Sequence, residues 1–178
     1  MMMECIARGG VEVVRSDPRD AWARTFDGAG YQGNANGLYE VEMAEMRRPG
    51  FPRWHDGKAI KLVLPFLSYL AVHAYRIVLM TRDPEEIRQS YQAAFRVNLG
   101  SGFVERYPEL VEEACQSLSN RHDVWSVRVV AAQDVWGHPT AIFRQLVKDG
   151  WPLDPVQAAS AVVPSRVRFR REHLVVGL

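Results

Sequence analysis

Cysteine is scarce in this chain: its 178 residues include only Cys5 and Cys115, which lie far apart in helix-like segments. This scarcity excludes a disulfide-stapled secreted scaffold and favours reduced thiols packed in a core. No signal peptide or targeting pattern is visible, and the most apolar stretch, residues 59–72, is too short to cross a bilayer. We therefore predict a cytoplasmic protein that has no membrane partner.

An excess of charge of one sign is also missing, because the formal net charge is +1. A balance this even gives no argument for a nucleic-acid partner. The five histidines show no metal-ligand spacing, and no catalytic triad pattern, dinucleotide fingerprint or Walker A motif occurs. The hydrophobic content of 47% is ordinary for a globular protein, and the length predicts a single domain over residues 1–178.

The most informative stretch runs from Ala74 to Phe95. Its short apolar run, residues 77–80, predicts a strand buried inside a parallel sheet. Asp83 then suits an N-cap and Pro84 the first helical position, while Glu86 completes a capping-box pattern. The stretch therefore predicts a strand, a tight turn and a helix. Four residues at helical spacing mark the expected buried face of that helix: Ile87, Tyr91, Ala94 and Phe95.

Arg82 stands in the predicted turn, and Ser90 lies two turns along the predicted helix. In open α/β sheets, ligands bind beyond the carboxyl ends of the strands. A guanidinium at that place suits a phosphate group, to which a serine hydroxyl could add a further donor. The alternative interpretation is that Arg82 pairs with Asp83 or a neighbouring acid, and that Ser90 is merely tolerated at the helix edge.

The Arg-Asp-Pro segment, with a serine eight residues after the arginine, resembles the 3′-phosphate-binding segment of sulfotransferases that use 3′-phosphoadenosine 5′-phosphosulfate. The resemblance implies an α/β fold with a mainly parallel sheet flanked by helices, as in P-loop sulfotransferases and nucleotide kinases. It also implies 3′-phosphoadenosine 5′-phosphosulfate as the sulfuryl donor, with its 3′-phosphate held by Arg82 and Ser90. The chemistry of that family requires no metal.

A second similarity covers residues 61–65, which resemble the K-T-H-L-P segment of the cytosolic sulfotransferases. Val63 replaces the histidine that serves those enzymes as general base, so a base must come from elsewhere. Residues 59–64 also predict a second buried parallel strand, in which Lys61 would face developing negative charge. The alternative for Lys61 is to snorkel to water at the end of the strand.

A third similarity covers Asn34–Glu40, which resembles the N-P-x-G-Y-Y-E segment of many bacterial members, although Ala35 and Leu38 depart from it. The resemblance makes Glu40 the candidate base for an acceptor hydroxyl, with His55 as the second candidate. The alternative for Glu40 is an exposed acid in the first turn of a helix, where acids are favoured.

The N-terminal region lacks a feature that the resemblance implies. Residues 1–8 predict a helix stopped by Gly9 and Gly10, and residues 11–14 predict a short strand. A βαβ protein rarely starts inside a helix, and the family's P-x-S/T-G-T/S loop, which binds the 5′-phosphosulfate, does not occur. We expect a chain that is shortened at its N-terminus and that transfers a sulfuryl group poorly.

The rest of the chain predicts a turn at residues 98–102, a helix at 108–118 and a strand at 124–132. A helix is predicted at 139–149, with Ile142, Phe143, Leu146 and Val147 pointing inward, and a last helix, capped by Asp154, at 154–162. A basic tail follows that includes Arg166 and Arg168. The resemblance implies that this tail folds over the donor's 3′-phosphate, and the alternative is a solvated basic end.

The resemblance as a whole implies a sulfotransferase that acts on a hydroxyl or amine of a small molecule or glycan. Nothing in the sequence specifies which acceptor. The alternative function is a non-catalytic remnant of this fold that binds a nucleotide or a partner protein. Sheet edges exposed by a missing strand would favour self-association into a homo-oligomer.

Overall fold

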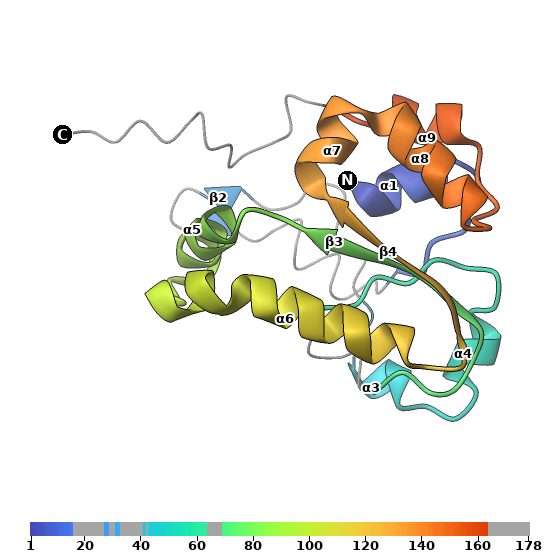
Figure 1. Ribbon diagram of the computed structural model, residues 1–178, viewed down its shortest axis with the longest axis horizontal. Helices are drawn as coiled ribbons and strands as arrows, with labels where there is room; N and C mark the ends of the chain where they lie inside the picture. The colour runs from blue at the N-terminus through green and yellow to red at the C-terminus, as the bar shows by residue number, and fades with distance from the viewer. Residues whose placement is uncertain (16–26, 29–30, 33–40, 42, 64–68, 164–178) are drawn as a thin grey trace.

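The computed structural model describes residues 1–15, 27–28, 31–32, 41, 43–63 and 69–163 (Figure 1). This part of the chain is α/β, with a small parallel sheet of two strands, β3 (Tyr75–Thr81) and β4 (Val124–Ala131), and surrounding helices. The helices are α1 (Met2–Arg8), α3 (Met43–Met46), α4 (Phe51–Trp54), α5 (Pro84–Phe95), α6 (Ser101–Ser119), α7 (Ala132–Gly137), α8 (Pro139–Lys148) and α9 (Pro155–Ser160). A separate antiparallel pair joins β1 (Asp27–Gly28) to β2 (Tyr31–Gln32).

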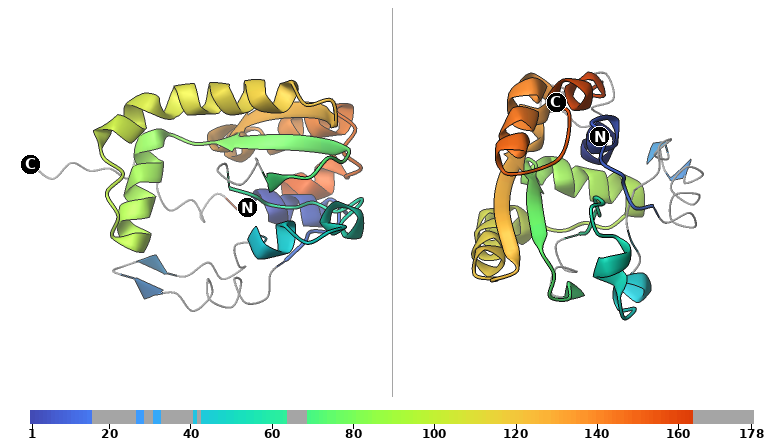
Figure 2. Two further views of the ribbon diagram at one scale, coloured as in Figure 1. Left: turned by 90° about the horizontal axis from the view of Figure 1, so that it is seen from below. Right: turned by 90° about the vertical axis from the view of Figure 1, so that its right-hand side faces the viewer.

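The two main strands run in the same direction, with Ile77 opposite Val127 and Met80 opposite Val130. The connection between them contains α5 and α6. Figure 2 shows α6 along one face of the strand pair, whereas α1, α8 and α9 gather on the other face. The carboxyl ends of both strands therefore meet at one edge of the sheet, where α5 and α7 begin.

The main hydrophobic core lies between the strand pair and the helices from the two ends of the chain. Phe143 and Leu146 of α8 and Val135 of α7 are fully buried, together with Cys5 of α1. Val130 of β4 packs into the same cluster. Truncation of a large buried side chain typically costs about 3–5 kcal/mol, so this cluster holds the terminal helices on the sheet.

Both cysteines are free, as the sequence predicted. Burial is the main cause that raises the pKa of the Cys5 thiol to about 11. Because the thiolate is the reactive form, this side chain is an inert part of the core.

Helix starts follow the predicted capping signals. The Asp83 carboxylate accepts hydrogen bonds from the backbone N–H groups of Glu85 and Glu86, at 2.8 and 3.3 Å. Asp154 caps α9 in the same way, and a proline follows the cap in both helices. These contacts join residues two or three apart, which is why the sequence alone predicted them.

The strands predicted at residues 11–14 and 59–64 are reduced, in the described part of the chain, to an isolated parallel bridge between Val13 and Ala59. Backbone bonds of 2.8 Å join Val14 N–H to the Ala59 oxygen and Ala59 N–H to the Glu12 oxygen. Residue 64 lies outside the described residues. A contact at one residue pair supplies too few ladder bonds for a regular strand.

The turn predicted at residues 98–102 ends earlier than expected. Residues 98–100 lie between helices, with the Gly100 N–H donating to Asn98 Oδ1 at 2.9 Å, but α6 begins at Ser101. The helix start predicted at Pro108 is wrong, because α6 contains Pro108. Pro108 was interpreted as a first helical position, which proline favours. Its side chain is exposed, so the proline ring lies on the surface of α6.

The predicted inward faces of two helices are narrower than expected. Tyr91 of α5 is 43% exposed and Val147 of α8 is 40% exposed, although both were expected to point inward. A strand pair covers only part of a helix surface, so side chains at the margin of an apolar stripe remain in water. None of the described helices combines the length and the apolarity needed to span a membrane.

Candidate functional site

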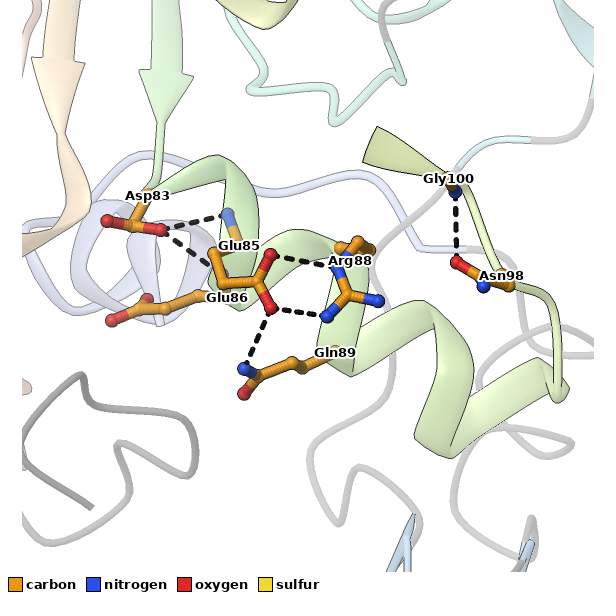
Figure 3. A network of polar contacts seen from close by, with 7 residues as sticks. All are labelled: Asp83, Glu85, Glu86, Arg88, Gln89, Asn98 and Gly100. Atoms are coloured by element: carbon orange, nitrogen blue, oxygen red, sulfur yellow. Dashed lines mark hydrogen bonds and ion pairs between the residues drawn. The ribbon is translucent and has the colours of Figure 1, made fainter. Parts of the chain in front are cut away.

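The turn between β3 and α5 carries charged side chains at the carboxyl edge of the sheet. Arg82 directly follows Thr81, the last residue of β3, and Asp83 caps α5. Figure 3 shows the capping carboxylate of Asp83 facing the helix N–H groups. Arg82 forms its ion pair with Glu86 instead, one helical turn further along the chain.

The contacts of Arg82 leave most of its donors unused. Its Nη2 donates to Glu86 Oε2 at 3.2 Å, and its backbone N–H donates to Tyr107 Oη at 3.3 Å. The Nε atom is buried and has no hydrogen-bond partner. The Arg82 side chain is 32% exposed, whereas that of Glu86 is 10% exposed. Since a guanidinium has five N–H donors, this group is partly open to water and only partly bonded.

Ser90 lies on α5 four residues after Glu86 and is partly buried. Residues four apart share one side of a helix, so Ser90 follows Glu86 on the side of α5 that faces Arg82. One cation and one hydroxyl along the same side of a helix suit a tetrahedral anion, because both groups donate hydrogen bonds to it.

Glu85, the other acid in the first turn of α5, pairs with a different arginine. Arg88 donates through Nε and Nη2 to both oxygens of Glu85, at 2.8 and 2.5 Å, and Gln89 adds a bond of 3.1 Å. These hydrogen bonds, first from Arg88 and then from Gln89, lower the pKa of Glu85 to about 2. In Figure 3 the Glu86 side chain points away from this network.

His55, a candidate base, lies at the C-cap of α4. Its Nε2 atom is 3.6 Å from Glu45 Oε1, and its ring meets the ring of Phe51 edge-on, with 4.7 Å between centroids. Both ring nitrogens are buried without a hydrogen-bond partner. No described contact joins His55 to Arg82, so these two predicted residues are not brought together.

Lys61 is partly buried, and its backbone oxygen accepts a bond of 3.5 Å from the N–H of Val41. The other predicted site residues, Glu40, Arg166 and Arg168, lie outside the described residues. Their predicted roles therefore stay predictions.

Two residues that contact Arg82 were not predicted from the sequence as parts of the site. Glu86 was assigned to a capping box, although its position four residues after Arg82 is also the spacing of a helical ion pair. Tyr107 is 25 residues from Arg82 along the chain. Nothing local in the sequence indicates that contact, because it depends on how α6 packs beside α5.

No family model matches this chain, and no curated protein or solved structure matches it either. Among the described residues, no group of three or more His, Cys, Asp or Glu side chains could hold a metal ion. The geometry of the β3–α5 turn is therefore the basis for a functional proposal.

Proposed function

We propose that this protein binds 3′-phosphoadenosine 5′-phosphosulfate and transfers its sulfuryl group to a hydroxyl or amine of a small molecule or glycan. The observation that carries the proposal is the place of Arg82, between a parallel strand and a capped helix, with a partly exposed guanidinium. Parallel α/β sheets bind ligands at this edge. In the proposed complex, Arg82 and Ser90 hold the 3′-phosphate of the nucleotide.

The remaining roles follow from the chemistry of the transfer. Glu40 accepts the proton of the acceptor hydroxyl as its oxygen attacks sulfur, with His55 as the second candidate base. Lys61 faces the negative charge that develops on the leaving group. Arg166 and Arg168 of the basic tail add positive charge at the 3′-phosphate.

The sequence contains no P-x-S/T-G-T/S loop to supply backbone donors to the sulfuryl group. Preorganised donors of that kind are usually among the largest contributions to catalysis. We therefore expect the 178-residue chain to bind adenosine 3′,5′-bisphosphate but to transfer sulfuryl groups slowly or not measurably. Rapid transfer to any acceptor by this chain would contradict the expectation.

Isothermal titration calorimetry with adenosine 3′,5′-bisphosphate tests the binding site. The wild-type chain should bind, and Arg82→Ala should weaken binding at least about tenfold, because a charge-assisted contact to phosphate is lost. Arg88→Ala is the matched control, since it removes the same charge from nearby α5, where the partner of Arg88 is Glu85. A folded wild-type chain that binds nothing, or equal losses in both variants, would overturn the proposal.

The second candidate is a non-catalytic role in binding a nucleotide or a partner protein. The Arg82–Glu86 ion pair favours it, because the charge at the turn is compensated without any ligand. Analytical ultracentrifugation distinguishes this role from the first. A folded chain that does not bind the bisphosphate but self-associates would support an interaction protein.

A further inference from the structure

Arg82 differs from the other arginines that are hydrogen-bonded to carboxylates in the described residues. Three of these pairs are bidentate, with two guanidinium nitrogens bonded to one carboxylate: Arg88–Glu85, Arg121–Asp123 and Arg128–Asp149. Arg82 gives a single nitrogen to Glu86, at 3.2 Å, and its buried Nε has no partner. Charge-assisted bonds are usually shorter, about 2.7–2.9 Å. The Arg82 guanidinium is therefore held by one long bond, and its other donors remain unused.

Glu86 is less able to move than Arg82. Its side chain is 10% exposed, and its backbone N–H is fixed by the Asp83 cap. If Arg82 left Glu86 to bind an anion, a buried carboxylate would remain without a counter-ion, which is costly. The favourable arrangement keeps the Glu86 bond and uses the remaining donors of Arg82 for the ligand.

We propose that Glu86 is a positioning residue, which holds the Arg82 guanidinium by Nη2 so that its remaining donors face the 3′-phosphate of the nucleotide. The inference rests on the proposed function. Tyr107 fixes the other end of the same residue, by accepting the Arg82 backbone N–H. An arginine that is held at its backbone and at one guanidinium nitrogen loses less conformational freedom when it binds phosphate.

The test measures how much the 3′-phosphate contributes to binding. Calorimetry gives the Kd of adenosine 5′-monophosphate and that of adenosine 3′,5′-bisphosphate. The Kd of the monophosphate divided by that of the bisphosphate measures how much the 3′-phosphate strengthens binding. The variants are Glu86→Ala, which removes the holding group, and Glu86→Gln, which keeps an oxygen acceptor without the charge. Glu85→Ala is the matched control, because it removes an adjacent acid that holds Arg88.

The proposal expects Glu86→Ala to lower the ratio on the order of tenfold, as loss of an orienting partner does at metal sites. Glu86→Gln and Glu85→Ala should keep the wild-type ratio or raise it. A ratio that rises in Glu86→Ala would show that the carboxylate only repels the phosphate, and an unchanged ratio would show a structural role alone. Either result overturns the positioning role while leaving the proposed function intact.

Two further results complete the test. Wild-type protein that binds both nucleotides equally would overturn the proposed function itself, and the positioning role with it. Thermal melts of each variant establish that it is folded. If Glu86→Ala does not fold, Glu86→Gln decides, because a tenfold loss of the ratio in that variant would contradict a role that needs only an acceptor.

Discussion

The two ends of β3 carry arginine–carboxylate pairs that differ in how completely they are bonded. At its start, Arg121 donates through Nε and Nη2 to Asp123, at 2.9 and 2.6 Å, and also bonds two backbone carbonyl groups. At its end, Arg82 donates to Glu86 through one nitrogen, at 3.2 Å. An arginine–carboxylate pair thus lies beyond each end of β3, and the two pairs differ in how many guanidinium donors are bonded.

The Arg121–Asp123 pair forms hydrogen bonds to the segment that precedes β3. Asp123 is 8% exposed and accepts the backbone N–H of His73 at 2.9 Å in addition to its two bonds from Arg121. The Arg121 guanidinium reaches the carbonyl oxygens of Leu70 and Ala71. Four hydrogen bonds within the protein use four of the five N–H donors of Arg121, which indicates a structural role for this cluster.

The comparison suggests a criterion for arginines: the number of guanidinium N–H donors already bonded within the protein, more than the charge, separates a structural arginine from one available to a ligand. A guanidinium with few unused donors can donate few hydrogen bonds to a phosphate. Arg82 retains donors, partial exposure and a place at the carboxyl edge of the sheet. The predictions below test whether stability depends on the Arg121–Asp123 pair at the start of β3, and whether ligand binding depends on Arg82 at its end.

The largest effect is expected for Asp123→Ala. The substitution leaves Arg121 and the His73 N–H without their acceptor, and loss of one partner of a buried pair costs about 3 kcal/mol. In a protein of this size, the melting temperature should fall by roughly 6–12 °C. Differential scanning calorimetry measures it, with the exposed Glu113→Ala of α6 as control. A change no larger than in the control would contradict the structural role.

Acid should destabilise the folded protein through its paired aspartates. Hydrogen bonds from Arg121 hold the pKa of Asp123 below its ordinary value of 3.8, and Arg128 lowers the pKa of Asp149 in the same way. The unfolded chain therefore takes up these protons at higher pH than the folded one, so their stabilisation is complete above about pH 5 and is lost as the pH falls below it.

Urea unfolding at several pH values between 5 and 3 measures this loss. The wild-type midpoint should fall with pH, and the fall should be smaller in Asp123→Asn, which cannot take up that proton. Equal slopes for the two proteins would mean that the Asp123 pair contributes nothing to the pH dependence.

Arg82→Ala should change stability less than Asp123→Ala does. It takes from the buried Glu86 carboxylate its single bond of 3.2 Å, but Glu86 keeps the favourable field of the first turn of α5, so we expect a loss of about 2 kcal/mol. The same variant should bind adenosine 3′,5′-bisphosphate at least about tenfold more weakly. If Arg82→Ala is as unstable as Asp123→Ala, Arg82 has a structural role like that of Arg121.

The smallest effect is expected for Glu85→Ala. Its pair with Arg88 is bidentate but lies at the protein surface, where water and salt screen the attraction. Chemical denaturation should give a midpoint equal to that of the wild type within measurement error. A clear loss of stability would show that bidentate geometry alone, without burial, suffices for a structural role.

Much of the local structure was predictable from the sequence. The strand at residues 77–80, the Asp83 and Asp154 caps and the apolar pair Phe143 and Leu146 were all found, because each depends on neighbours within one or two helical turns. The strand predicted at 124–132 corresponds closely to β4 (Val124–Ala131).

The candidate site was predictable only in part. Arg82 and Ser90 were chosen as candidates from their place after an apolar strand, and their role in binding stays a prediction. The alternative that Arg82 pairs with a neighbouring acid is confirmed, with Glu86 as that acid. The Tyr107 contact was not found, because it joins residues 25 apart. The early start of α6 was missed because Pro108 resembles a helix start in any local window.

The sequence by itself determined where the helices around Arg82 and Asp154 begin and which side chains are apolar, because these are properties of short segments. Only the tertiary structure decided which donors of each arginine are satisfied. Arg121 meets carbonyl groups some 50 residues away, whereas Arg82 meets one carboxylate and retains a buried, unpartnered Nε. Hydrogen bonding of a guanidinium depends on the oxygen atoms that packing brings within about 3 Å of it, and a linear sequence does not contain that distance.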